Sequence, residues 1–174
     1  MKTTETTAIA DAFPLAVLMA ALVLAAAPAR AAGDDCAARI AAAWSKVGDV
    51  PAYRQVVDMP KQGLRMETVV IGNAVHSTVA GTTQRMDLPP GGRKALVDRF
   101  AGATPTLSCS AVGEETIDGR PTVVYDFTRA PLPGLEKGPV QQKVWIGKSD
   151  GLVRRLVGAD AIVDVAYENV TAPR

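Results

Sequence analysis

The fold is indicated most clearly by residues 143–155, which read Lys-Val-Trp-Ile-Gly-Lys-Ser-Asp-Gly-Leu-Val-Arg-Arg. An apolar run ends at Ile146, a polar turn of Ser149-Asp150-Gly151 follows, and a second apolar run begins at Leu152. Two short runs joined by a tight turn predict two neighbouring antiparallel strands. The chain around this hairpin therefore has to supply further strands that pair with it.

Short runs of the same kind recur on both sides of the hairpin, from residue 53 to residue 167. Turn signals separate them, among them Gly72-Asn73 and Asp118-Gly119, and Gly113 inside the run 106–117 is typical of a β-bulge. Together they predict about eight antiparallel strands in one curved sheet.

Two segments have helical spacing instead. Residues 34–47 place Cys36, Ile40, Trp44 and Val47 on one apolar stripe, with Asp34 or Asp35 as the N-cap and Gly48 as the stop. Residues 93–100 predict a short second helix in the middle of the chain. We therefore expect an α+β fold in which an N-terminal helix and a short mid-chain helix cover one face of the sheet.

The first 32 residues have the character of a targeting segment. Residues 13–27 are uncharged and end before Pro28, and Ala29-Arg30-Ala31 is a small-x-small cleavage pattern. We expect a signal peptide over 1–32, cleaved after Ala31 or Ala32, and a single periplasmic domain over 33–174. The alternatives are an uncleaved anchor or a wrongly assigned start codon. After cleavage the protein is not expected to span a membrane.

Both cysteines lie in the part expected to be exported, where thiols can pair. A Cys36–Cys109 disulfide would close a loop of about 74 residues and, in the chain-entropy model, contribute about 4 kcal/mol. A free thiol or an intermolecular bridge is the alternative. The two aspartates before Cys36 do not fit the small, apolar positions that precede a lipidated cysteine.

Three segments carry a family resemblance: the strand 119–125, the hairpin 143–155, and Val165-Ala-Tyr-Glu-Asn-Val170. Their order resembles that of exported proteins of the LolA and LolB type, a superfamily that includes sensors of the RseB type. The resemblance implies an unclosed antiparallel half-barrel, covered by helices, that holds acyl chains against its concave face. It identifies no individual ligand-binding residue.

Composition excludes several classes of function. The net charge of +1 argues against a nucleic-acid binder, and one histidine in 174 residues excludes most metal sites and histidine-dependent active sites. His76 stands alone in a strand, and Glu114 and Glu115, as strand neighbours, point to opposite faces. Arg154 and Arg155 are expected on a solvated face, and the alternative is contact with an anionic head group. We expect no enzyme activity, no cofactor and no metal.

The apolar faces of the strands are the candidate binding surface, since methionines and aromatic residues suit a pliable lining for an apolar ligand. The alternative is that these residues only form the core under the helix. The expected function is non-enzymatic binding of an apolar or lipidic ligand, or of lipoprotein acyl chains. The other interpretation is an envelope protein-interaction or sensor module without a small-molecule ligand. The candidate lining residues are Tyr53, Val57, Met59, Met66, Val70, Val123, Tyr125, Phe127, Trp145, Val163, Val165 and Tyr167.

Overall fold

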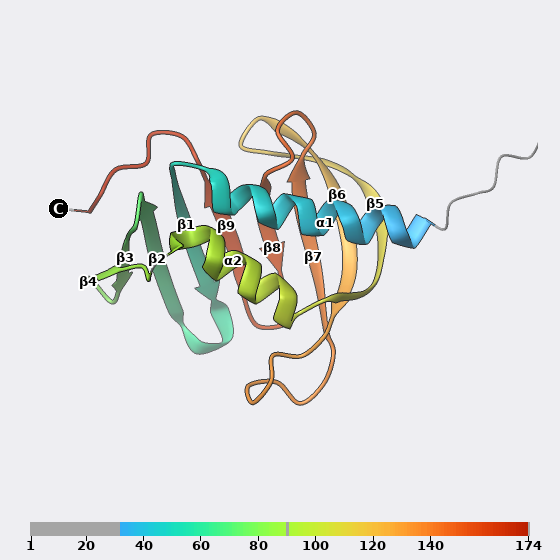
Figure 1. Ribbon diagram of the computed structural model, residues 1–174, viewed down its shortest axis with the longest axis horizontal. Helices are drawn as coiled ribbons and strands as arrows, with labels where there is room; N and C mark the ends of the chain where they lie inside the picture. The colour runs from blue at the N-terminus through green and yellow to red at the C-terminus, as the bar shows by residue number, and fades with distance from the viewer. Residues whose placement is uncertain (1–31, 90, 174) are drawn as a thin grey trace, which may run out of the picture.

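The computed structural model describes residues 32–89 and 91–173, so the expected signal peptide lies almost wholly outside the described residues. Within them the chain forms two α-helices, one 3-10 turn and nine strands (Figure 1). Their bounds are α1 Ala32–Asp49, β1 Ala52–Met59, η1 Pro60–Gln62, β2 Leu64–Ile71, β3 Ala74–Val79, β4 Thr82–Asp87, α2 Gly92–Ala103, β5 Thr106–Ile117, β6 Arg120–Arg129, β7 Val140–Gly147, β8 Val153–Val157 and β9 Ile162–Ala166.

All nine strands belong to one antiparallel sheet with the order β4-β3-β2-β1-β9-β8-β7-β6-β5. The chain begins in the middle of the sheet with β1 and returns to pair β9 against it, with Val57 opposite Val163. The sheet does not close, because β4 and β5 remain its two edges. The expected α+β fold with an unclosed antiparallel sheet is confirmed, with nine strands where about eight were expected.

The helices lie on the same side of the sheet, with α2 beside α1 (Figure 1). Helix α1 begins at Ala32, so Asp34 and Asp35 lie in its first turn and neither is the N-cap that the sequence predicted. Asp35, near the start of the helix, still favours it, because an acidic side chain there interacts with the positive end of the helix dipole. Helix α2 runs past Phe100 to Ala103 and ends where the Thr104 amide donates to the Phe100 carbonyl.

The register of the strands decides which side chains lie under the helices. Tyr125 is opposite Val144 and Leu156 is opposite Val144, so these three share the helix-covered face of the sheet. The main core forms between this face and the stripe of α1 that carries Cys36, Ile40, Ala43 and Val47, all at most 5% exposed. This confirms the apolar stripe predicted for α1, although Trp44 packs only partly buried at its margin.

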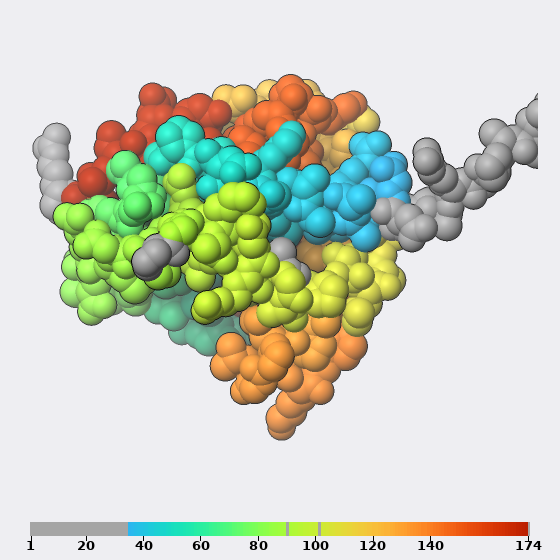
Figure 2. Space-filling view, in the orientation of Figure 1, coloured from blue at the N-terminus to red at the C-terminus, as the bar shows by residue number. Residues whose placement is uncertain are grey.

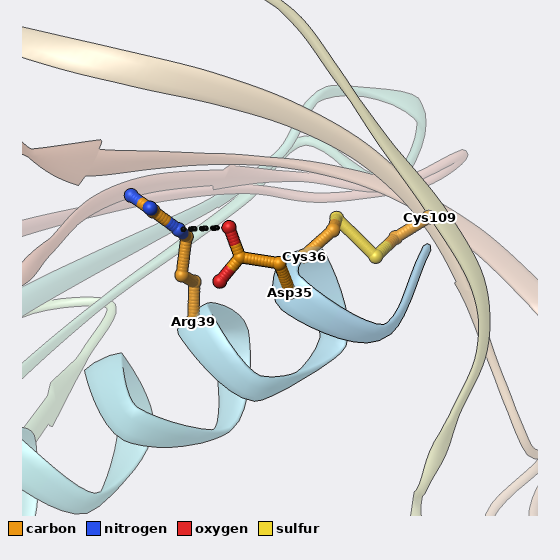
Figure 3. Close-up of a disulfide and its surroundings, with 4 residues drawn as sticks. All are labelled: Asp35, Cys36, Arg39 and Cys109. Atoms are coloured by element: carbon orange, nitrogen blue, oxygen red, sulfur yellow. Dashed lines mark hydrogen bonds and ion pairs between the residues drawn. A yellow bond between two sulfur atoms is a disulfide. The ribbon is translucent and has the colours of Figure 1, made fainter. Parts of the chain in front are cut away.

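A disulfide between Cys36 and Cys109 links the first turns of α1 to the edge strand β5, as predicted (Figure 3). The bridge lies on the sheet side of α1, whereas Asp35 and Arg39 form an ion pair on the helix beside it. The Asp35 carboxylate raises the pKa of Arg39 by accepting a hydrogen bond from its Nε at 3.2 Å. Because its sulfur is bonded to Cys109, Cys36 is not a free thiol.

The predicted β-bulge in β5 is also present. The pairing of β5 with β6 shifts register between Ala111 and Gly113. Gly113 adopts φ +158°, close to extended backbone, so the extra residue bends the strand without requiring a left-handed conformation. The bulge lies in the exposed part of β5, beyond Cys109 along the strand.

Candidate functional site

A cavity of about 580 Å³ lies between α1, α2 and the helix-covered face of the sheet. Its size falls in the range of pockets that hold small-molecule ligands. Figure 2 shows α1 and α2 side by side on this face of the molecule, with the loop between β6 and β7 projecting below them. The lining residues are Ala37, Ala38, Ile40, Ala41, Trp44, Gln55, Phe100, Thr104, Pro105, Thr106, Phe127, Arg129, Gln142, Leu156, Val163 and Val165.

The cavity exists because α1 presents small side chains on one flank. Ala37, Ala38 and Ala41 face the cavity, Ile40 lies at its border with the core, and Ala43 packs into the core. An alanine methyl reaches too short a distance to meet the sheet, so the space between this flank and β9 stays open. The sheet supplies Val163 and Val165 as its floor.

Helix α2 supplies the second wall. Phe100 lines the cavity and is still 47% exposed, which places it at the margin between cavity and solvent. Leu96, one turn earlier, is 51% exposed and does not line the cavity. Apolar side chains at such a margin let an apolar ligand enter without passing a charged barrier.

One end of the cavity is polar, where β6 and β7 meet the loop 130–139. Arg129 and Gln142 line this end, together with Thr104 and Thr106. The Arg129 residue is 8% exposed, and its Nε donates to Gln142 Oε1 at 3.1 Å. Strand pairing explains this cluster. Arg129 lies opposite Thr106 of β5, and Gln142 of β7 lies opposite Phe127, which is two residues before Arg129 on the same face of β6.

The charge of Arg129 is balanced by Glu136 of the same loop. Arg129 Nη1 and Nη2 donate to the two carboxylate oxygens of Glu136, each at 2.6 Å, and the Leu132 amide donates to the same carboxylate at 2.7 Å. The Arg129 guanidinium and then the Leu132 amide lower the pKa of Glu136 to about 2. The pair therefore stays ionised, and bidentate, throughout the neutral range.

The candidate lining residues divide into three groups. Phe127, Val163 and Val165 line the cavity. Tyr125 is buried in the core beneath α1, and Val123, Tyr53 and Tyr167 pack against that core. By register, the remaining members of the helix-covered face lie further along β1 and β2; these are Val57, Met59, Met66 and Val70.

Trp145 is the member that the structure places elsewhere. It lies opposite Val124 in the sheet and packs with Ile117 and Val124, on the face away from α1. Its indole Nε1 donates to Glu115 Oε2 at 2.8 Å. The expectation that Trp145 shares a face with Tyr125 is therefore wrong, because β6 and β7 pair so that Tyr125 meets Val144 instead.

Arg154 also departs from expectation. It was expected on a solvated face but is 4% exposed, paired with Asp150 and stacked 4.9 Å over the Tyr167 ring. The register shift between Trp145 and Ile146 leaves Arg154 as an extra residue on β8, which turns it toward Tyr167. Burial raises the pKa of Tyr167, whose hydroxyl donates to the Val153 carbonyl at 2.7 Å.

The sequence did not single out the alanines of α1, Phe100 of α2, or the polar group around Arg129. Alanines carry no binding signal of their own, and Arg129 and Glu136 became partners only because the loop between them folds back. The one usable signal was the loop 130–139 itself, whose three prolines and two glycines make a constrained turn next to a strand end.

A second, smaller hollow of about 300 Å³ lies on the other flank of α1. Ala42 and Ala43 face it from the helix, and Lys46, Lys148 and Arg39 surround it. Lys46 Nζ donates to the Asp150 backbone carbonyl, whereas Lys148 and Arg39 form ion pairs with Glu114 and Asp35. It is shallower and more charged than the large cavity and provides the natural control for it.

Neither catalytic nor metal-binding groupings stand out among the residues that the structure describes. Over 32–89 and 91–173, no three of His, Cys, Asp and Glu converge on a possible metal position. Glu114 and Glu115 bind different partners, Lys148 and Trp145. No helix in these ranges has the length and apolar character needed to cross a membrane.

Comparison with known proteins adds a likeness of fold. No family model and no curated protein matches the sequence. The structure is similar to the lipoprotein LppX of Mycobacterium tuberculosis, with 13% identity, 79% of this chain and 96% of that chain covered, and a TM-score of 0.48. It is also similar to LprF of Mycobacterium bovis, with 18% identity, coverage of 79% and 94%, and a TM-score of 0.44.

A third similar structure is a DUF1329 family protein of Desulfovibrio piger, at 10% identity. It covers 78% of this chain and 93% of that chain with a TM-score of 0.29. At such scores the likenesses carry no conclusion about function, and the geometry of the cavity has to stand by itself.

Proposed function

We propose that this chain is a non-enzymatic carrier that binds an apolar or lipidic ligand in the cavity between α1, α2 and the sheet. The observation that carries the proposal is the cavity of about 580 Å³, lined by alanines and apolar side chains, with Gln55 on its floor and the other polar groups near Arg129. Binding would be driven by removal of apolar surface from water, at about 25 cal/mol per Å².

The proposal extends to where the protein works. A signal peptide over 1–32 followed by one domain over 33–174, with a LolA-like half-barrel, would make the chain a periplasmic carrier. The disulfide between Cys36 and Cys109 supports this, because such bridges persist in oxidising compartments. Lipoprotein acyl chains are one form that the apolar ligand could take.

Native mass spectrometry of the mature protein from its own periplasm, beside its solvent extract, tests the proposal. We expect an amphiphile to travel with the protein and to appear in the extract. Ala41→Trp should abolish this, since the indole would occupy the cavity. Ala42→Trp is the matched control, because it adds the same side chain at the neighbouring position, which faces the smaller hollow. A bare mass for the wild type, or equal loss in both variants, would refute the proposal.

A second candidate function rests on the open edge of the sheet. All six residues of β4 are exposed, and Met86 is 61% exposed. An unpaired edge can accept a strand from another protein. In an interaction or sensor module of the envelope, the wild type would have a bare mass and would instead cross-link to a partner through β4.

A further inference from the structure

We infer that the cavity takes a neutral single-chain amphiphile, such as an acyl ester, in preference to a free fatty acid, and that Glu136 sets this preference. The inference rests on the proposed function and adds to it the chemical class of the ligand. It follows from the polar end of the cavity, where Arg129, Gln142, Thr104 and Thr106 meet.

A carboxylate buried in a cavity needs a cation to compensate its lost hydration. Among the described lining residues the one cation is Arg129. Its charge is already neutralised by two hydrogen bonds of 2.6 Å to Glu136, held in turn by the Leu132 amide. A fatty-acid carboxylate would therefore meet a neutral ion pair and would have to compete with Glu136 for the guanidinium.

The same end retains hydrogen-bond donors that suit a neutral acceptor. Arg129 has five N–H groups. Four are used by Gln142, Ala130 and the two Glu136 oxygens, so one N–H on Nη2 lacks a partner among the described residues. The Gln142 amide oxygen accepts from Arg129, and its NH₂ group forms no bond within the described part of the chain.

These donors match an ester or glycerol oxygen, which accepts hydrogen bonds and brings no charge. The apolar remainder of the ligand would lie against Phe127, Val163 and the alanines of α1. The cavity volume of about 580 Å³ suits one such molecule of drug-like size. Glu136 acts as a positioning residue, since it works through Arg129 and does not itself line the cavity.

Competition against the neutral fluorescent probe N-phenyl-1-naphthylamine tests the inference. The competitors are monooleoylglycerol and oleate, which have the same acyl chain, used below micellar concentrations at alkaline pH. We expect the wild type to favour the ester by about tenfold, the scale of one uncompensated polar interaction. Equal affinities, or tighter binding of oleate, would overturn the inference.

Glu136→Gln sharpens the test by releasing the charge of Arg129. The variant should bind oleate about tenfold more tightly relative to the ester than the wild type does. Glu114→Gln removes an equal charge from an exposed pair with Lys148 and should keep the wild-type ratio. An unchanged ratio in Glu136→Gln would overturn the role of Glu136.

The outcomes distinguish a failure of this inference from a failure of the proposed carrier function. If the probe binds but the ester does not displace it preferentially, the cavity binds apolar molecules and the assigned ligand class is wrong. If neither probe nor competitor binds the wild type, the carrier function itself fails and the inference fails with it. The wild-type ratio alone decides the ligand class, so poor folding of the variant does not remove the test.

Discussion

The two flanks of α1 differ sharply although they belong to one helix over one sheet. On one flank Ala43 and Val47 are at most 5% exposed and pack against Tyr125, Val144 and their neighbours, with Ile40 at the border between this core and the cavity. On the other, Ala37, Ala38 and Ala41 face an open cavity. Because Ala43 is packed and Ala41 is not, side-chain size alone does not decide where this helix closes onto the sheet, and what lies opposite each alanine matters as well.

Both flanks depend on the disulfide that holds the first turns of α1 against β5, so its removal should have the largest effect. We expect Cys36→Ser/Cys109→Ser to lower the free energy of unfolding by about 4 kcal/mol, because the loop between residues 36 and 109 is no longer constrained in the unfolded chain. Urea unfolding measures this. Reduction of the wild type should produce the same loss, and an unchanged midpoint would contradict the prediction.

Substitutions at two alanines, one on each flank, test this difference between the flanks. Ala43 is 1% exposed within the core, so Ala43→Leu should overpack it and cost about 1–3 kcal/mol. Ala41 faces the cavity, so Ala41→Leu should leave the free energy of unfolding nearly unchanged while weakening binding of an apolar probe. Thermal unfolding and probe fluorescence on both variants check this. Equal destabilisation would mean that the cavity flank is packed after all.

Sequence patterns predicted the parts of this fold that depend on local chemistry. The β-runs, the apolar stripe of α1, the Cys36–Cys109 bridge and the Gly113 bulge each follow from residue type and spacing. The face of the sheet on which Trp145 lies could not be predicted in this way, because alternation within β7 does not reveal the register between β7 and β6. A shift of one residue exchanges the two faces, and only the pairing of Val124 with Trp145 decides it.

The candidate site was less predictable than the fold for a related reason. Its sheet side includes Phe127, Val163 and Val165, whose alternation along strands is visible in the sequence. Its open space arises from methyl groups that do not reach the sheet, and residue types alone do not show what lies opposite an alanine. The Arg129–Glu136 pair requires the loop between the two residues to fold back, and its prolines indicate a turn without giving its direction.

The smallest effect concerns the ion pair at the polar end, and it depends on pH. The pKa of Glu136 falls from 4.5 to about 2 in the folded protein because of Arg129 and the Leu132 amide. A lowered pKa means that the folded state favours the carboxylate, so the stabilisation is complete above pH 4.5 and is lost as the pH falls toward 2. The gap in unfolding free energy between wild type and Glu136→Gln should therefore shrink over this window.

Urea unfolding of both proteins across that window measures the gap, with Glu114→Gln as the control for an exposed pair. A gap that stays constant down to pH 2 would mean that Glu136 does not hold its charge through Arg129. The polar end would then contain a free guanidinium, and the cavity would be suited to a carboxylate. The acid titration thus tests the Arg129–Glu136 pair without any ligand. This pair gives the cavity its polar end, and the packed flank of α1 has no counterpart to it among the described residues.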